Sequence, residues 1–150
     1  MSLLLPPYAD ENLTPGERTF LNRMKRVYEN RDRDANLYVQ PRIGQLEPDF
    51  ILIDPFKGVL VVEVKDWSLN YIRSSNQRVT QLSDGRQSRN PASRCNQYLR
   101  NLERLLRTDL RLVTDGILNF PTFAKVFFPN LSAGELNDRI DLRNILDQHP

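Results

Sequence analysis

Residues 48–65 read PDFILIDPFKGVLVVEVK, and this stretch decides the fold. It contains two runs rich in β-forming residues, Phe50 to Ile53 and Val59 to Val64, separated by a turn that carries proline and glycine. Such a turn is short enough to join antiparallel strands in a hairpin. The second run is apolar at nearly every position, which is typical of a central strand covered on both faces. The stretch therefore predicts a hairpin in the middle of a sheet.

Two carboxylates flank this hairpin. If Ile53 pairs with Val59 across the turn, the same register pairs Asp49 with Glu63. Side chains alternate along a strand, so Glu63 and Lys65 point to the same side. Two carboxylates at roughly 5 Å on an apolar hairpin destabilise it unless cations compensate them, and Lys65 and a divalent metal would do so. The alternative is an ordinary solvent-facing Glu63 paired with Lys65, because a shift of one residue in register separates the carboxylates.

A capped helix precedes the hairpin. Residues 14–17 read TPGE, in which Thr14 is the expected N-cap, proline takes the first helical position and Glu17 completes a capping box. Apolar residues spaced by three and four continue this helix to about Glu29 and predict that one face packs on the core.

The remaining segments extend this pattern into an α/β fold with a central mixed sheet flanked by helices. We expect a lead-in over residues 1–13, one domain over residues 14–130, and a C-terminal extension over residues 131–150 with short helical pieces, read as the start of a linker to a further domain. The other expected elements are a strand from Leu37 to Ile43, an exposed hairpin from Tyr71 to Ser88 turning at Asp84-Gly85, a helix from Asn90-Pro91 to about Arg107, and a buried strand from Thr122 to Phe128.

The composition excludes several chemistries. The chain has 150 residues, one cysteine (Cys95) and one histidine (His149), so an internal disulfide, a Cys/His zinc site and a histidine-based triad are not available. Carboxylates, lysine, arginine and hydroxyls remain, and the oxygen atoms of this set suit a hard cation such as Mg²⁺. No apolar run approaches the roughly 20 residues of a membrane span, and the start lacks the features of a signal peptide, so we expect a cytoplasmic protein that does not enter a membrane.

Positive charge is concentrated in the middle of the chain. Residues 73–111 contain nine arginines and three acidic residues, although the net charge of the chain is only +2. Arginine forms forked contacts with phosphate, so this segment predicts contact with nucleic acid. The alternative is a solvated helix face. The arginines expected to contact nucleic acid are Arg94, Arg100, Arg104 and Arg107.

The order of motifs resembles the nuclease-related domain (NERD) family, a branch of the PD-(D/E)xK nuclease superfamily. The resemblance runs from Thr14 to Asn130. It implies a mixed α/β nuclease-like core, metal-dependent cleavage of DNA, and frequent fusion to helicase or other DNA-processing domains. The motifs that carry it are Gly16-Glu17, Pro48 to Ile51, Val61 to Trp67, Asn90-Pro91 and Val126 to Pro129.

The resemblance also implies roles for individual residues. Asp49, Glu63 and the backbone carbonyl of Val64 would bind Mg²⁺, with Mn²⁺ able to replace it. Lys65 would hold the attacking water and stabilise charge on the phosphate. Glu17 matches the acidic residue of the first helix in the superfamily, although the capping box alone explains a glutamate there.

One further site position of the family lies on the second helix. Gln97 is the candidate for the glutamine found there in related nucleases, but the expected spacing after Asn90-Pro91 falls on Arg94, so both remain open. We expect Trp67, Tyr98 and Cys95 to pack in the core rather than to contact substrate.

The sequence thus predicts a Mg²⁺-dependent deoxyribonuclease domain, either alone or as one part of a larger helicase or DNA-processing protein. The alternative is a non-catalytic nucleic-acid-binding or interaction module on a nuclease-derived fold. Two adjacent carboxylates would repel a phosphate backbone in the absence of metal, which favours the nuclease.

Overall fold

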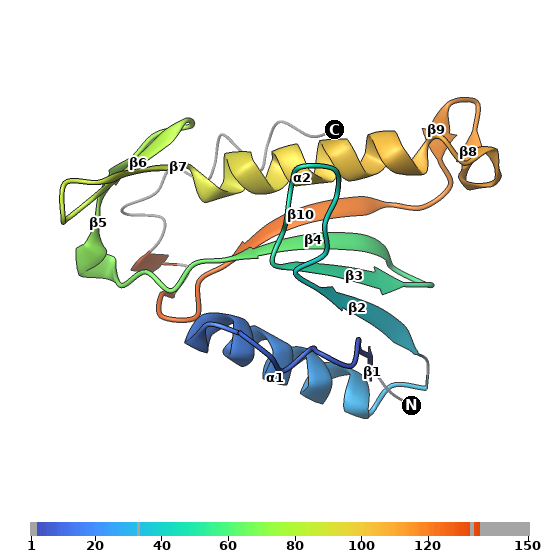
Figure 1. Ribbon diagram of the computed structural model, residues 1–150, viewed down its shortest axis with the longest axis horizontal. Helices are drawn as coiled ribbons and strands as arrows, with labels where there is room; N and C mark the ends of the chain where they lie inside the picture. The colour runs from blue at the N-terminus through green and yellow to red at the C-terminus, as the bar shows by residue number, and fades with distance from the viewer. Residues whose placement is uncertain (1–2, 33, 133, 136–150) are drawn as a thin grey trace.

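A computed structural model describes residues 3–32, 34–132 and 134–135 of the chain. A mixed sheet of five strands lies between two helices, with α1 on one face and α2 on the other (Figure 1). This arrangement confirms the predicted α/β fold with a central mixed sheet flanked by helices. In spatial order the strands are β1 (Leu3–Leu4), β2 (Ala35–Val39), β3 (Phe50–Asp54), β4 (Gly58–Val64) and β10 (Thr122–Phe127).

The β3–β4 hairpin has the predicted register. Ile53 pairs with Val59 and Phe50 with Val62, in antiparallel orientation. Gly58 closes the turn with φ +102°, a conformation that glycine adopts without strain. On its other side β4 pairs in parallel with β10, so it is a central strand as expected.

Each helix begins at its predicted cap. In α1 (Pro15–Glu29), the Glu17 backbone N–H donates to Thr14 Oγ1 (3.2 Å), and the Thr14 N–H donates to Glu17 Oε2 (3.1 Å). In α2 (Pro91–Leu106), the side chain of Asn90 accepts a hydrogen bond from the Ala92 N–H (2.9 Å). These bonds satisfy backbone donors that a helix start otherwise leaves unpaired.

The alternation of side chains along β4 divides the core into two halves. Val62 and Val64 face α1, where Phe20 packs against Phe50 with ring centroids 4.7 Å apart. Val59 and Val61 face α2, where they contact the buried residues Cys95, Tyr98, Leu99 and Leu102. Cys95 and Tyr98 therefore lie in the core, as expected.

Two predicted strands differ from the structure. The strand expected to reach Ile43 ends at Val39, because Gln40 has a positive φ of +48° and Pro41 follows. The strand expected to be buried, β10, is an edge strand of the described sheet, and Phe123 on it is 46% exposed. An apolar run alone does not reveal that one edge of a strand lacks a neighbour.

A separate antiparallel sheet connects β4 to α2 and extends past the end of the central sheet (Figure 1). It has the predicted turn at Asp84-Gly85, but a third strand joins the expected hairpin. Its elements are the 3₁₀ turn η1 (Leu69–Tyr71) and the strands β5 (Ile72–Ser75), β6 (Val79–Leu82) and β7 (Gln87–Arg89).

Smaller elements follow α2. The 3₁₀ turn η2 (Leu110–Leu112) leads into a two-stranded hairpin of β8 (Val113–Thr114) and β9 (Ile117–Leu118). Most of the expected C-terminal helical pieces fall on residues 136–150, which lie outside the described residues. Among the described helices, none has the length and apolar character needed to cross a bilayer.

Candidate active site

The predicted carboxylate pair forms at the open end of the β3–β4 hairpin. The register that pairs Phe50 with Val62 brings Asp49 opposite Glu63, on the sheet face that packs against α2. Asp49 is fixed there because its Oδ2 accepts a hydrogen bond from the Val64 backbone N–H (2.7 Å). Two strands thus hold both carboxylates through their backbones.

Glu63 is buried but only half satisfied. Its side chain is 5% exposed, and Oε1 lies 3.2 Å from Nζ of Lys65. Oε2 is buried and has no hydrogen-bond partner among the described residues. An unpaired buried carboxylate oxygen costs free energy of folding, so this atom indicates a position that a cation would satisfy.

The pKa of the second carboxylate, Asp49, is shifted by burial and by its proximity to Glu63. The pKa of Asp49 is raised from 3.8 to about 6, first by burial and then by the negative charge of Glu63. The Val64 N–H and the positive charge of Lys65 act in the opposite direction but do not cancel these effects. The pair therefore holds more negative charge than its surroundings stabilise.

Glu17 serves the capping box and also faces the site. Its side chain is buried, and Oε2 accepts hydrogen bonds from the Thr14 N–H and from Nε2 of Gln40 (3.3 Å). Burial raises the pKa of Glu17, and the charge of Asp49 adds to this effect. The two explanations offered by the sequence for this glutamate are thus compatible.

The segment that follows β4 is anchored at three points. The Lys65 N–H donates to the Phe127 carbonyl (3.0 Å), and the Gly16 N–H of α1 donates to Asp66 Oδ2 (3.1 Å). Nδ2 of Asn130 donates to the Asp66 carbonyl (2.9 Å). Lys65 therefore leaves the sheet on a backbone held by both α1 and the chain after β10.

The contact between α1 and Asp66 leaves no room for a side chain at Gly16, and this can be tested. A Cβ at this position would lie 2.1 Å from Asp66 Oδ1, so Gly16→Ala must displace the carboxylate. We expect a loss of about 1 kcal/mol in the free energy of unfolding, measured by urea denaturation, because a charge-assisted hydrogen bond is lost. In an Asp66→Ala background the same change should stabilise α1 slightly, because alanine favours a helix. An equal loss in both backgrounds would contradict this account.

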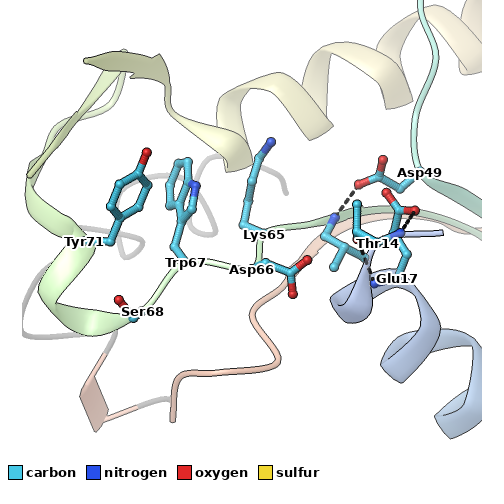
Figure 2. Close-up of a pocket in the computed structure, with 9 residues that line it drawn as sticks. Thr14, Glu17, Asp49, Lys65, Asp66, Trp67, Ser68 and Tyr71 are labelled. Atoms are coloured by element: carbon cyan, nitrogen blue, oxygen red, sulfur yellow. Dashed lines mark hydrogen bonds between the residues drawn. The ribbon is translucent and has the colours of Figure 1, made fainter. Parts of the chain in front are cut away.

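A pocket of about 430 Å³ opens beside these residues (Figure 2). Its volume lies within the range of ligand sites, roughly 300–1,000 Å³. Carboxylates line one end and aromatic rings the other, with Lys65 between them. The lining residues are Thr14, Glu17, Asp49, Val64, Lys65, Asp66, Trp67, Ser68 and Tyr71.

The two candidates on the second helix do not line this pocket. Nε of Arg94 donates to the hydroxyl of Tyr98, and its guanidinium lies 5.6 Å from the ring centroid. Burial raises the pKa of the Tyr98 hydroxyl, with a smaller contribution from the charge of Glu63. Oε1 of Gln97 accepts a hydrogen bond from Arg89 of β7. The choice between Arg94 and Gln97 therefore stays a prediction.

The arginines further along α2 lie away from the pocket. Oε1 of Glu103 accepts a hydrogen bond from Thr122 Oγ1 (2.8 Å), and Thr122 pairs with Val59. Val59 is four strand positions, or about 13 Å, from Glu63. The structure thus places Arg104 and Arg107 near the far end of the sheet, and Arg100 lies between that end and the first turns of α2.

The donors at the open end of the hairpin fit a hard cation. In the part of the chain that the structure describes, no three His, Cys, Asp or Glu residues gather closely enough to hold a metal. Asp49, Glu63 and the Val64 carbonyl nevertheless offer only oxygen atoms, and one of these is the unpartnered Glu63 Oε2. Mg²⁺ is usually held by one or two carboxylates, with water and substrate phosphate completing its shell, so this donor set suits Mg²⁺ or Mn²⁺.

Five residues of the pocket lining are not predicted as site residues from the sequence, namely Thr14, Asp66, Trp67, Ser68 and Tyr71. The pattern at Thr14 indicates only a helix cap, and Trp67 is expected in the core. Tyr71 reaches the pocket because η1 turns the chain back, and no local pattern indicates that turn.

Comparison with known proteins gives one match. A family model described as "Nuclease-related domain" matches residues 14–129, from the cap of α1 to two residues after β10. No curated protein and no solved structure matches the chain.

Proposed function

Because this chain belongs to the nuclease-related domain family, we propose that it is a metal-dependent deoxyribonuclease domain that hydrolyses phosphodiester bonds in DNA. Family membership indicates a nuclease-related function. The observation that carries the finer proposal is the pairing of the half-buried Asp49 with the buried Glu63, which has an unpartnered oxygen. The domain would act alone or as part of a larger helicase or DNA-processing protein.

Each site residue has a role that follows from its position. Asp49, Glu63 and the carbonyl of Val64 would hold Mg²⁺, and Mn²⁺ would be able to replace it. When bound, such an ion supplies Lewis-acid polarisation of the phosphodiester and activation of water. Glu17 lines the same end of the pocket and orients the water through its fixed carboxylate.

Lys65 contributes a positive charge where negative charge develops. Its Nζ is held 3.2 Å from Glu63 Oε1, and its side chain is only 21% exposed. A preorganised cation in a partly desolvated site stabilises the transition state more than the same charge does in water. Lys65 therefore orients the water and stabilises the charge on the phosphate, and no histidine is needed.

Cleavage of labelled single- and double-stranded DNA with Mg²⁺, Mn²⁺ or EDTA tests this proposal. We expect cutting with either metal and none with EDTA. Lys65→Ala should reduce the rate at least about 100-fold, because it removes one preorganised electrostatic contact. Lys57→Ala is the matched control, because Lys57 is exposed in the turn at the other end of the hairpin.

Two results would contradict the proposal. Cutting in EDTA, or equal rates for Lys65→Ala and Lys57→Ala, would place the activity elsewhere. DNA binding without any cutting would instead favour the non-catalytic module.

A further inference from the structure

Trp67 forms one wall of the pocket and is only partly used by the core. Its ring centroid lies 6.3 Å from that of Phe128 and 6.4 Å from that of Tyr71, with interplanar angles of 48° and 58°. These tilted contacts leave ring surface that faces the pocket. The expected core packing is therefore present, but it accounts for only part of the side chain.

Tyr71 is braced on the same wall by the three-stranded sheet. Its hydroxyl donates to Asp84 Oδ2 (2.9 Å) and accepts from Nη2 of Arg86 (2.9 Å). Asp84 and Arg86 lie in the turn between β6 and β7. The aromatic end of the pocket is thus fixed from two directions, because Trp67 follows the anchored Asp66.

Lys65 links the aromatic end to the carboxylates. Its Nζ lies 5.7 Å from the Trp67 ring centroid and 3.2 Å from Glu63 Oε1. Figure 2 shows Lys65 and Trp67 on one side of the segment after β4, and Asp66 on the other. The pocket therefore presents carboxylates, one cation and aromatic rings in that order. A nucleotide presents its phosphate and its base in the same order, joined by one sugar.

Resting on the proposed function, we propose that Trp67 and Tyr71 stack an unpaired nucleobase next to the scissile phosphate, so that the substrate is single-stranded DNA. A base inside a duplex has neighbours on both faces and is not available to an aromatic wall unless it is extruded. Stacking on aromatic side chains is a general way to bind single strands.

The lining also indicates tolerance of base sequence. Arginine, lysine, asparagine and glutamine are the side chains that read base edges with two hydrogen bonds. Among the described residues that line the pocket, Lys65 alone is of these types, and its Nζ is paired with Glu63 Oε1. Stacking uses the face that every base has, so we expect similar binding of different unpaired sequences.

Trp67 itself reports on the proposed contact, because it is the only tryptophan in the chain. We would titrate the intact protein with a 12-residue oligothymidylate, using Ca²⁺ in place of Mg²⁺ and confirming on a gel that the oligonucleotide stays intact. The expected result is quenching of tryptophan fluorescence at saturation. A blunt 24-base-pair duplex at the same nucleotide concentration should cause less than half of that quenching.

Variants at the same position separate stacking from packing. In anisotropy titrations with labelled oligothymidylate, Trp67→Phe should bind within about 3-fold of the unmodified protein, because an aromatic ring remains. Trp67→Leu should bind at least about 10-fold more weakly, because stacking of one base is lost. Phe123→Leu is the matched control, since Phe123 is 46% exposed and pairs with Leu60, far from the pocket. Melting temperatures verify that each variant is folded.

Three results would overturn the inference: no quenching by oligothymidylate, unchanged affinity of folded Trp67→Leu, or an equal loss for the single strand and the duplex. None of these depends on cleavage. Metal-dependent cleavage without quenching would leave the proposed nuclease standing and remove the stacking wall. Quenching without cleavage would retain the stacking wall and remove the nuclease.

Discussion

Replacing Glu63 with glutamine is expected to reduce Mg²⁺-dependent DNA cleavage by roughly 1,000-fold and to raise the melting temperature of the metal-free protein. Loss of a residue that merely supports a metal ligand typically costs 10–100-fold in activity, and loss of a ligand itself should cost more. Glutamine preserves the shape of the side chain, so the loss of activity would report the missing charge. Single-turnover cleavage with Mg²⁺ measures it.

The opposite effect on stability follows from burial. Glu63 is 4% exposed and faces the Asp49 carboxylate, with Oε2 unpaired. Neutralising it removes a repulsion between like charges and the cost of burying a charge. The ion pair with Lys65 is lost, but Lys65 can turn toward solvent, so we expect a net gain of about 1 kcal/mol in the free energy of unfolding.

The control for this prediction is Glu29→Gln at the end of α1, where the glutamate is exposed and distant from the cap that faces the site. This variant should leave both cleavage and melting temperature unchanged. If Glu63→Gln destabilises the metal-free protein, the ion pair with Lys65 stabilises the folded state by more than the repulsion from Asp49 and the burial of the Glu63 charge destabilise it, and the prediction is wrong. If it stabilises the protein and still cleaves at the normal rate, Glu63 is not a metal ligand.

The fold could be predicted where a short segment determines the local structure by itself. The turn between β3 and β4 fixes the register of the hairpin, because one closed loop length determines every later pair. The capping residues Thr14 and Asn90 fixed the starts of both helices. The same register places Asp49 opposite Glu63, so the position of this carboxylate pair could be predicted without a structure.

The features that the sequence did not predict depend on contacts with residues far away in the chain. The apolar run from Thr122 to Phe128 is the same whether a strand is central or at an edge, and only the assembled sheet shows that β10 is an edge. The arginines of α2 are exposed at Arg100, Arg104 and Arg107, but the sequence does not reveal that α2 leads Arg104 and Arg107 away from the pocket. Gln97 accepts a hydrogen bond from Arg89. Arg89 lies on β7, the third strand of the small sheet, which the sequence does not predict.

The stability of the metal-free protein is expected to fall as pH rises from about 4 to about 6. The pKa of Asp49 is about 6 in the folded chain and 3.8 ordinarily, mainly because of burial and then because of the charge of Glu63. Between these two values the folded state binds more protons than the unfolded state, so raising the pH destabilises the fold. The difference corresponds to ~3 kcal/mol, complete above pH 6. Glu17 changes stability in the same direction, because its pKa is also raised.

Mg²⁺ should reverse this dependence. A metal that binds only the folded state and only ionised carboxylates stabilises most where Asp49 has lost its proton. Melting temperatures measured from pH 4.5 to 8, with 10 mM Mg²⁺ or with EDTA, should therefore converge at low pH and separate above pH 6. Asp49→Asn should flatten the EDTA curve and abolish the separation. The pKa of Asp84 lies near 2, below this window, so Asp84→Asn is the control that should retain both effects. If the two curves stay parallel at all pH values, Mg²⁺ binds somewhere other than at Asp49, and the carboxylate pair then has no part in holding it.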